Sequence, residues 1–159
     1  MKLLFAATVL TLFAACTTTP PAPMSSARAA PTAVPSSASF TQILNSFRAS
    51  QGLGSMQPNA ALTRAAQAHA EDMRARNYFS HRARNGPNGE TFGQRAAGAG
   101  CTILSGAENI AFGQTSEAEV FTGWQNSSGH RRNMLGRDYT FFGLGRAGDI
   151  WVLKLSSGC

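Results

Sequence analysis

Apolar residues near position 40 recur with the period of an α-helix. They occupy the i, i+3, i+4 and i+7 positions that share one helix face: Phe40, Ile43, Leu44 and Phe47. Ser39 comes just before them and Gln42 follows three residues later, which is the capping-box spacing typical of a helix start. Gly52 and Gly54 break the pattern. We therefore predict a helix that begins at residue 40 and ends before Gly52.

Three further helical segments follow along the chain. The longest opens near Asn59 and runs to about Arg76, with one face made of Leu62, Ala65, Ala66, His69 and Met73. A short helical stretch is predicted around residues 91–97. Another helix begins at Ser116, where Ser116 and Glu119 form a second capping box, and residues 126–129 interrupt it.

The end of the chain has the pattern of strands. Residues 141–145 and 150–155 are two apolar segments separated by the turn Ala147-Gly148-Asp149, which predicts an antiparallel hairpin. Helices gathered early and strands gathered late favour an α+β domain.

Residues 1–15 are predicted to be an export signal and not part of the fold. Lys2 is followed by an apolar run that ends in the small pair Ala14 and Ala15. A membrane-spanning helix needs about 20 apolar residues, and this run is shorter. The pattern is typical of a secretory signal peptide, which the mature protein loses.

The tetrapeptide Phe13-Ala14-Ala15-Cys16 resembles the lipobox of bacterial lipoproteins, in which signal cleavage frees a cysteine that carries acyl chains. Phe13 departs from the aliphatic residue usual there. The alternative is an ordinary signal peptide cut after Ala15. We predict lipidation at Cys16, and through it a membrane-anchored lipoprotein that faces the periplasm or the cell exterior.

Residues 16–39 combine this cysteine with a tether. From residue 17 to residue 39 the chain has five prolines and one charged residue, Arg28, so it cannot bury enough apolar surface to fold. The remaining residues, 40–159, are enough for one compact domain. Removing Cys16 from the cysteine count leaves Cys101 and Cys159, which we expect to form a disulfide in an oxidising compartment. Two free thiols are the alternative.

The domain is basic, with twelve of the fourteen Lys and Arg residues and all eight Asp and Glu residues, and eleven of those twelve are Arg. The arginines are scattered over different segments and do not line one helix face, so a solvated basic surface is favoured over nucleic-acid binding. We expect the protein to be a monomer. Its expected partners are a membrane, which it reaches through the lipid anchor at Cys16, and a ligand that is a lipid or a component of the cell envelope.

Three strings stand out in order along the domain: residues 78–81 (YFSH), residues 107–111 (AENIA) and residues 123–135 (GWQNSSGHRRNML). With the helix around residues 62–70 and Gly143-Leu144-Gly145 near the end, they resemble the bacterial branch of the CAP superfamily. This superfamily comprises the cysteine-rich secretory proteins, antigen 5 and the pathogenesis-related-1 proteins, and its domain is also called SCP. The resemblance extends from about residue 40 to the C-terminus.

The resemblance implies an α-β-α sandwich, with a small antiparallel sheet between helical layers and a central cleft lined by two histidines and two acidic residues. His81 matches the first histidine, Glu108 the first glutamate and His130 the second histidine. The second glutamate has no clear match, because Ser127 stands at its position.

Two neutral imidazoles and one carboxylate, from His81, His130 and Glu108, can hold a divalent ion such as Zn²⁺ or Mg²⁺ with one position open. The missing second carboxylate removes a ligand, so we expect weak binding that fails when the histidines protonate.

Each candidate residue also has a structural interpretation. Glu108 can fix the cleft walls by accepting hydrogen bonds from a histidine or from backbone amides. His69 lies on an apolar helix face, where a hydrogen-bonded packing role is the more ordinary one. Ser127 lies near His130 in sequence, and helix termination explains it as well as a nucleophilic role does.

Three functions compete on this basis. The first is a non-catalytic binding module for a lipid-like or cell-envelope ligand. The second is a metal-dependent or His-dependent hydrolase, a peptidase or esterase, although HExxH and GxSxG motifs are absent and no residue is a clear nucleophile. The third is a structural protein of the cell envelope, whose role needs the anchor, the tether and a stable fold but no ligand-binding cleft.

Overall fold

The computed structural model describes residues 39–159; the predicted signal peptide, Cys16 and the tether up to residue 38 lie outside the described residues. The described part contains these helices and strands: α1 (Phe40–Ser50), β1 (Gln57–Pro58), α2 (Ala60–Ala75), α3 (Phe92–Gly98), β2 (Gly106–Phe112), α4 (Glu117–Asn126), α5 (Ser128–Met134), β3 (Phe141–Ala147) and β4 (Ile150–Ser156). Within residues 39–159, no helix is long and apolar enough to cross a membrane.

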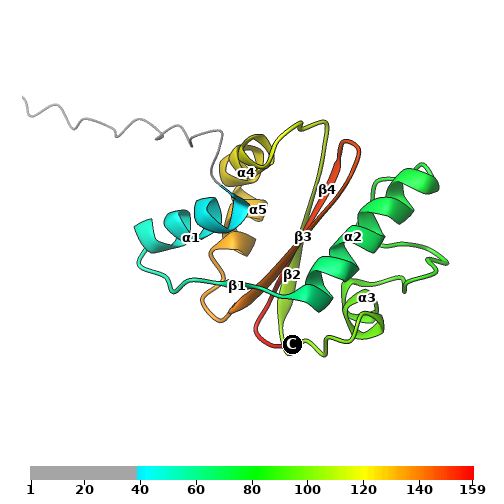
Figure 1. The fold of residues 1–159 in the computed structure, drawn as a ribbon, viewed down its shortest axis with the longest axis horizontal. Helices are drawn as coiled ribbons and strands as arrows, with labels where there is room; N and C mark the ends of the chain where they lie inside the picture. The colour runs from blue at the N-terminus through cyan, green and yellow to red at the C-terminus, as the bar shows by residue number, and fades with distance from the viewer. Residues whose placement is uncertain (1–38) are drawn as a thin grey trace, which may run out of the picture. The chain divides into compact units, whose positions relative to one another are not determined.

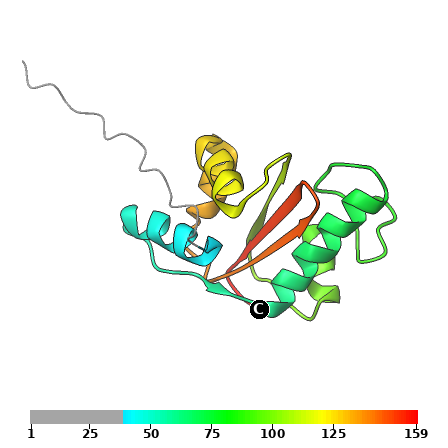
Figure 2. The same ribbon diagram turned by 45° about the horizontal axis from the view of Figure 1, so that its top comes forward.

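The sheet lies between two helical layers. Its strand order is β1-β3-β4-β2, and β4 pairs in antiparallel fashion with both β3 and β2. Helices α2 and α3 lie on one side of it, and α1, α4 and α5 lie on the other (Figures 1 and 2). This arrangement confirms the predicted α-β-α sandwich.

The expected antiparallel sheet needs one correction, since β1 runs parallel to β3 and makes the sheet mixed. The two-residue β1 is held where the chain passes from α1 to α2, by backbone hydrogen bonds from Gln57 to Thr140 and from Asn59 to Phe142. A segment this short is too brief to show the alternation that predicts a strand.

The predicted helix starts are confirmed. Ser39 and Gln42 form a complete capping box, the Asn59 side chain accepts from the first turn of α2, and Ser116 accepts from the backbone nitrogen of Glu119. The predicted capping box at Ser116 is only half formed, because the Glu119 carboxylate accepts from Thr115 instead of the Ser116 backbone. Strand β2 and helix α5 were not predicted as regular elements. Strand β2 carries Glu108 and Asn109 at its buried centre, and α5 is a seven-residue helix rich in polar residues.

The faces of β4 divide the core. Trp151, Leu153 and Leu155 pack with the layer formed by α1, α4 and α5, whereas Ile150 and Val152 pack with α2. Because side chains alternate along a strand, Lys154 falls in the second series and faces α2. A buried lysine therefore lies in the interior between the sheet and α2.

Two glycines of β3 let α2 approach the sheet closely. A Cβ at Gly143 would lie 2.2 Å from the Leu62 carbonyl carbon, and a Cβ at Gly145 would lie 2.3 Å from the Gln67 backbone nitrogen. At the far end of the domain, the predicted disulfide between Cys101 and Cys159 is present and closes a separation of 58 residues.

Substitution of Gly145 tests this close approach. Gly145→Ala should lower the free energy of unfolding by about 3 kcal/mol, because the new methyl group meets helix backbone that cannot rotate away. The matched control is Gly123→Ala in α4, where a Cβ meets nothing within 4 Å and should raise stability by up to about 1 kcal/mol. Urea unfolding measures both, and equal effects would contradict the packing described.

Candidate functional site

Glu108 is a buried carboxylate at the centre of β2, directly opposite Lys154 on β4. Backbone hydrogen bonds join Ser157 to Ser105 and Gly113 to Asp149, so hydrogen-bonded pairs fall on the odd-numbered residues of β2. Glu108 and Lys154 therefore form a non-hydrogen-bonded pair, in which facing side chains come closest. The Lys154 ammonium donates to Glu108 Oε2.

Arg95 supplies a second cation from α3. Its Nη2 lies 3.2 Å from Glu108 Oε1 and 3.0 Å from Oε2, and also donates to the carbonyl of His81 at 2.9 Å. Its Nη1 donates to the carbonyl of Glu90 at 2.8 Å. The buried guanidinium thus joins the carboxylate to His81 and Glu90, the two ends of a loop that is called the His81 loop below.

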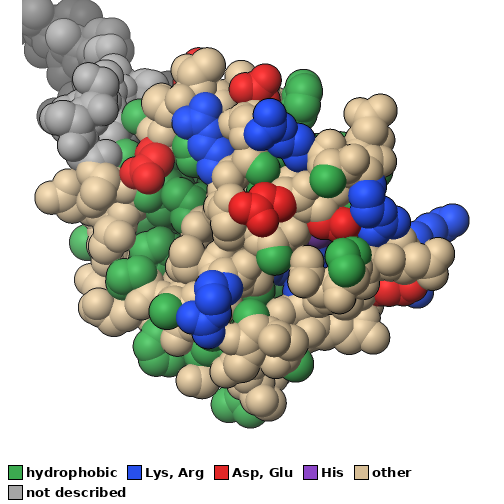
Figure 3. Space-filling view, turned by 45° about the vertical axis from the view of Figure 1, so that its right-hand side comes forward, with side chains coloured by type: hydrophobic (Ala, Val, Ile, Leu, Met, Phe, Trp, Pro, Cys, Tyr) green, Lys and Arg blue, Asp and Glu red, His purple; other side chains and the backbone are tan. Residues whose placement is uncertain are grey.

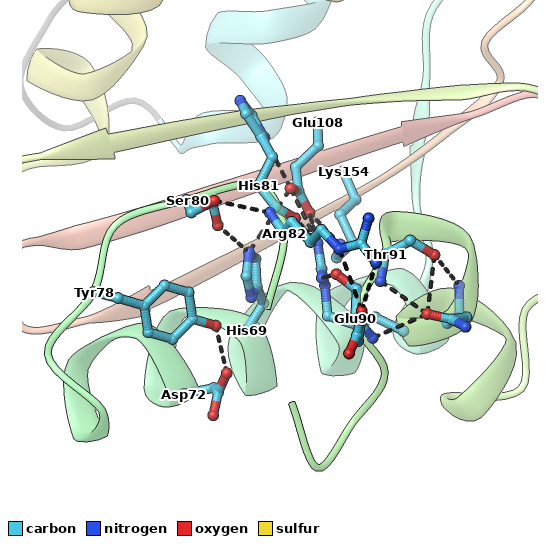
Figure 4. A network of polar contacts seen from close by, with 12 residues as sticks. His69, Asp72, Tyr78, Ser80, His81, Arg82, Glu90, Thr91, Glu108 and Lys154 are labelled. Carbon is cyan, nitrogen blue, oxygen red and sulfur yellow. Dashed lines mark hydrogen bonds and ion pairs between the residues drawn. The ribbon is translucent and has the colours of Figure 1, made fainter. Parts of the chain in front are cut away.

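His81 lies on that loop with its ring directed at the carboxylate (Figure 4). Its Nδ1 is 3.0 Å from Glu108 Oε1, and 57% of its side chain is exposed. Because an ionised carboxylate only accepts hydrogen bonds, Nδ1 carries the proton and donates it. The other ring nitrogen, Nε2, is left for solvent or a ligand.

His69 approaches the same carboxylate from α2. Its Nε2 is 3.1 Å from the carbonyl oxygen of Ser80 and 3.8 Å from Glu108 Oε1. The residue is fully buried, and burial lowers the pKa of its imidazole to about 4, so it is neutral at pH 7. His69 therefore has the predicted packing position and is also a neighbour of the site.

These five residues, Glu108, Lys154, Arg95, His81 and His69, are called the Glu108 cluster below. Burial opposes ionisation of Glu108, but the hydrogen bond from His81 and the charges of Lys154 and Arg95 outweigh it and hold the pKa of this carboxyl well below its usual range. Burial lowers the pKa of Lys154 to about 8, which leaves it protonated at pH 7. The cluster thus combines one negative charge with two positive charges.

His130 stands apart from the cluster on α5. Its backbone carbonyl accepts from Asn109 Nδ2 at 3.1 Å, and Asn109 Oδ1 accepts from Asn133 Nδ2 at 2.8 Å. Burial and the nearby charge of His81 lower the pKa of His130. The structure therefore brings His130 near His81, while no contact joins it to Glu108 among the described residues.

No carboxylate replaces the missing second glutamate within residues 39–159. Ser127 stands at the junction of α4 and α5 and makes no side-chain capping bond. Of the two acids in the first turn of α4, Glu117 accepts from the backbone nitrogen of Phe40 and Glu119 accepts from Thr115. Both acids are used at helix ends and do not reach the Glu108 cluster.

The predicted metal set of His81, His130 and Glu108 does not fit a metal in this structure. Within residues 39–159, no three His, Cys, Asp or Glu side chains gather closely enough to hold an ion. Among these residues His130 makes no contact with Glu108, and the carboxylate is already paired with Lys154 and Arg95.

Two exposed aromatic rings, close in sequence to His81 and Glu108, contact each other. Phe79, two residues before His81, is 50% exposed, and Phe112, at the end of β2, is 64% exposed. Their ring centroids are 6.3 Å apart in an edge-to-face arrangement. Basic side chains occupy several separate places on the face shown in Figure 3 and form no single stripe, as the sequence predicts.

A cavity of about 360 Å³ lies between α2 and α3. Arg64, Ala68 and Asn88 are among the residues that line it, and Arg95 also borders it. His81 and His130 do not line this cavity, so it differs from the cleft that the resemblance implies.

Sequence reasoning missed Lys154, Arg95 and the aromatic pair. The sequence did contain a sign that Lys154 is buried, because it is the single lysine of the domain and interrupts the apolar run of residues 150–155. The sequence contains no such sign for Arg95, since it is one arginine among eleven and its buried position depends on partners far along the chain.

The depressed pKa of His69 predicts how stability depends on pH. The unfolded chain takes up this proton near pH 6.5, whereas the folded chain resists it until about pH 4, so stability falls as pH falls through this window. Between pH 6.5 and pH 5, His69 should account for a loss of about 1 to 2 kcal/mol. Urea unfolding of the wild type and of His69→Gln measures it, and parallel pH profiles would contradict the assignment.

The sequence profile of the Cysteine-rich secretory protein family, CAP, matches residues 41–150. The Uncharacterized protein YkwD of Bacillus subtilis (strain 168) is 35% identical over an alignment of 128 positions, which covers 76% of this chain and 49% of YkwD. The chain therefore spans about half the length of this relative.

Two solved structures share the fold. An extracellular protein containing an SCP domain from Bacillus anthracis has a TM-score of 0.69 and 27% identity, over 74% of this chain and 38% of that one. An outer surface protein from Borrelia burgdorferi has a TM-score of 0.65 over 76% of this chain and 90% of its own, and its 19% identity supports the fold alone. Family profile, relative and fold agree with the sequence resemblance, and the chain belongs to the cysteine-rich secretory protein (CAP) family.

Proposed function

We propose that this chain is an exported lipoprotein, held at a membrane through Cys16, whose CAP domain binds a lipid-like ligand beside His81 without transforming it. Export and anchoring rest on the signal peptide and lipobox patterns of residues 1–16. Two similar proteins are described as an extracellular protein and an outer surface protein, which supports a position outside the cytoplasm.

The observation that carries the binding proposal is the exposed aromatic pair, one ring of which belongs to Phe79, two residues before the oriented His81. Phe79 and Phe112 present two large apolar rings to solvent, and burying them against a ligand would release their hydration water. His81 lies two residues from Phe79 with Nε2 available for one hydrogen bond. An apolar surface beside a single polar group suits a molecule with a hydrocarbon part and a polar head.

The cluster itself favours binding over catalysis. Among the described residues, no hydroxyl or thiol is hydrogen-bonded to His81, so no side chain is placed as a nucleophile for this histidine. Lys154 and Arg95 are buried, and their contacts with Glu108 hold the His81 loop in place. The charged residues thus support the shape of the site.

A fluorescent fatty acid, cis-parinaric acid, tests the binding surface. The full chain should bind it, and Phe79→Ala/Phe112→Ala should weaken binding at least about fivefold, because the two rings supply much of the apolar contact area. Leu104→Ala is the matched control, since Leu104 is an apolar residue that is 85% exposed and is not part of the Phe79–Phe112 pair. Fluorescence titration gives the affinities.

Two outcomes would contradict the binding proposal. Equal losses in the aromatic and Leu104 variants would show that the pair is not the binding surface. Hydrolysis of an ester or peptide panel that disappears in His81→Ala would favour a hydrolase instead, for which the hydrogen bond between His81 and Glu108 is the supporting observation.

The anchor is tested separately with Cys16→Ala. Without a thioether-forming cysteine the chain cannot be acylated, so it should move from the membrane fraction to the soluble periplasm or the medium. Fractionation followed by immunoblotting measures the distribution. The same membrane-bound fraction in the wild type and in a variant whose size on the immunoblot shows that residues 1–15 have been removed would reject lipidation as the anchor.

A further inference from the structure

Both oxygens of the Glu108 carboxylate accept hydrogen bonds from neighbouring side chains. Its Oε1 accepts from His81 Nδ1 at 3.0 Å and from Arg95 Nη2 at 3.2 Å, and its Oε2 accepts from Arg95 Nη2 at 3.0 Å and from Lys154 Nζ. A carboxylate offers about four lone-pair sites. Three donors, His81, Arg95 and Lys154, therefore compete with a metal ion for these sites.

The charge of the cluster also opposes a second cation. The side chains of Glu108 and Lys154 are 5% and 0% exposed, and that of Arg95 is 1% exposed. Charges buried in this way are poorly screened by water and salt. A divalent ion that reached Glu108 would meet two fixed positive charges and gain the attraction of only one carboxylate.

Packing holds the Lys154 ammonium where it is. In the sheet, Lys154 stands between Glu108 on β2 and Gly143 on β3. Its Nζ lies 4.6 Å from the centre of the Phe92 ring, a cation–π contact that favours the charged form. The close approach of α2 at Gly143 closes this part of the interior, so the lysine has no route to solvent.

We propose that Lys154 is a built-in cation at Glu108, which takes the place of a divalent metal and makes the His81 site independent of metal. A lysine compensates the carboxylate and orders it, as a metal would. It offers no open coordination position and does not turn bound water into a nucleophile. The inference concerns metal selectivity and does not depend on the lipid-like ligand proposed above.

Zinc titration of the full chain, purified from membranes in detergent, tests the proposal by isothermal titration calorimetry. The wild type should show no zinc binding that depends on His81. Lys154→Met removes the ammonium, keeps a side chain of similar length and frees one oxygen of Glu108. This variant should bind one Zn²⁺ at least about tenfold more tightly than any zinc binding that remains in the wild type, and adding His81→Ala should abolish the gain.

Lys154→Arg is the matched control, because it keeps the positive charge and should behave as the wild type does. Circular dichroism checks that each variant is folded, and Lys154→Gln replaces the methionine variant if the latter does not fold. A folded neutral variant that gains no zinc affinity would overturn the proposal. A wild-type chain that binds zinc through His81 would overturn it whatever the variants show.

Discussion

One carboxylate buried inside the sheet constrains much of this domain. Removing a charged carboxylate from water costs several kcal/mol unless partners offset it, and Lys154 and Arg95 do so for Glu108. A slip of one residue between β2 and β4 would turn Lys154 to the opposite face and leave Glu108 unpaired. The ion pair therefore fixes the register of the two strands, while Arg95 fixes α3 and the His81 loop against them.

The glycines of β3 make this interior possible. With no side chain at Gly143 or Gly145, α2 lies against the backbone of the sheet and brings His69 under the carboxylate. The imidazole remains neutral there because it is buried, so it adds no third positive charge to the cluster. The glycines of β3 thus allow a neutral histidine, and not a further charge, to pack beside Glu108.

Local signals in the sequence account for what could be predicted. The caps at Ser39, Asn59 and Ser116 act within three or four residues, and the cysteine pair follows from parity once Cys16 is set aside. Strand β2 could not be read in this way, because Glu108 is explained by a lysine 46 residues away. The partner of a buried charge depends on strand register, which the local pattern of residues does not encode.

Within the cluster the Glu108 side chain is buried and the His81 side chain is exposed, and this difference limits the chemistry available to the site. The carboxylate side chain is 5% exposed, whereas the imidazole hydrogen-bonded to it is 57% exposed. In a catalytic triad the carboxylate stabilises an imidazolium that forms as the proton moves. Here two cations already share that carboxylate, so its remaining effect is to orient the ring. An oriented, exposed imidazole can recognise a polar group of a ligand, and recognition does not require the histidine to take a proton.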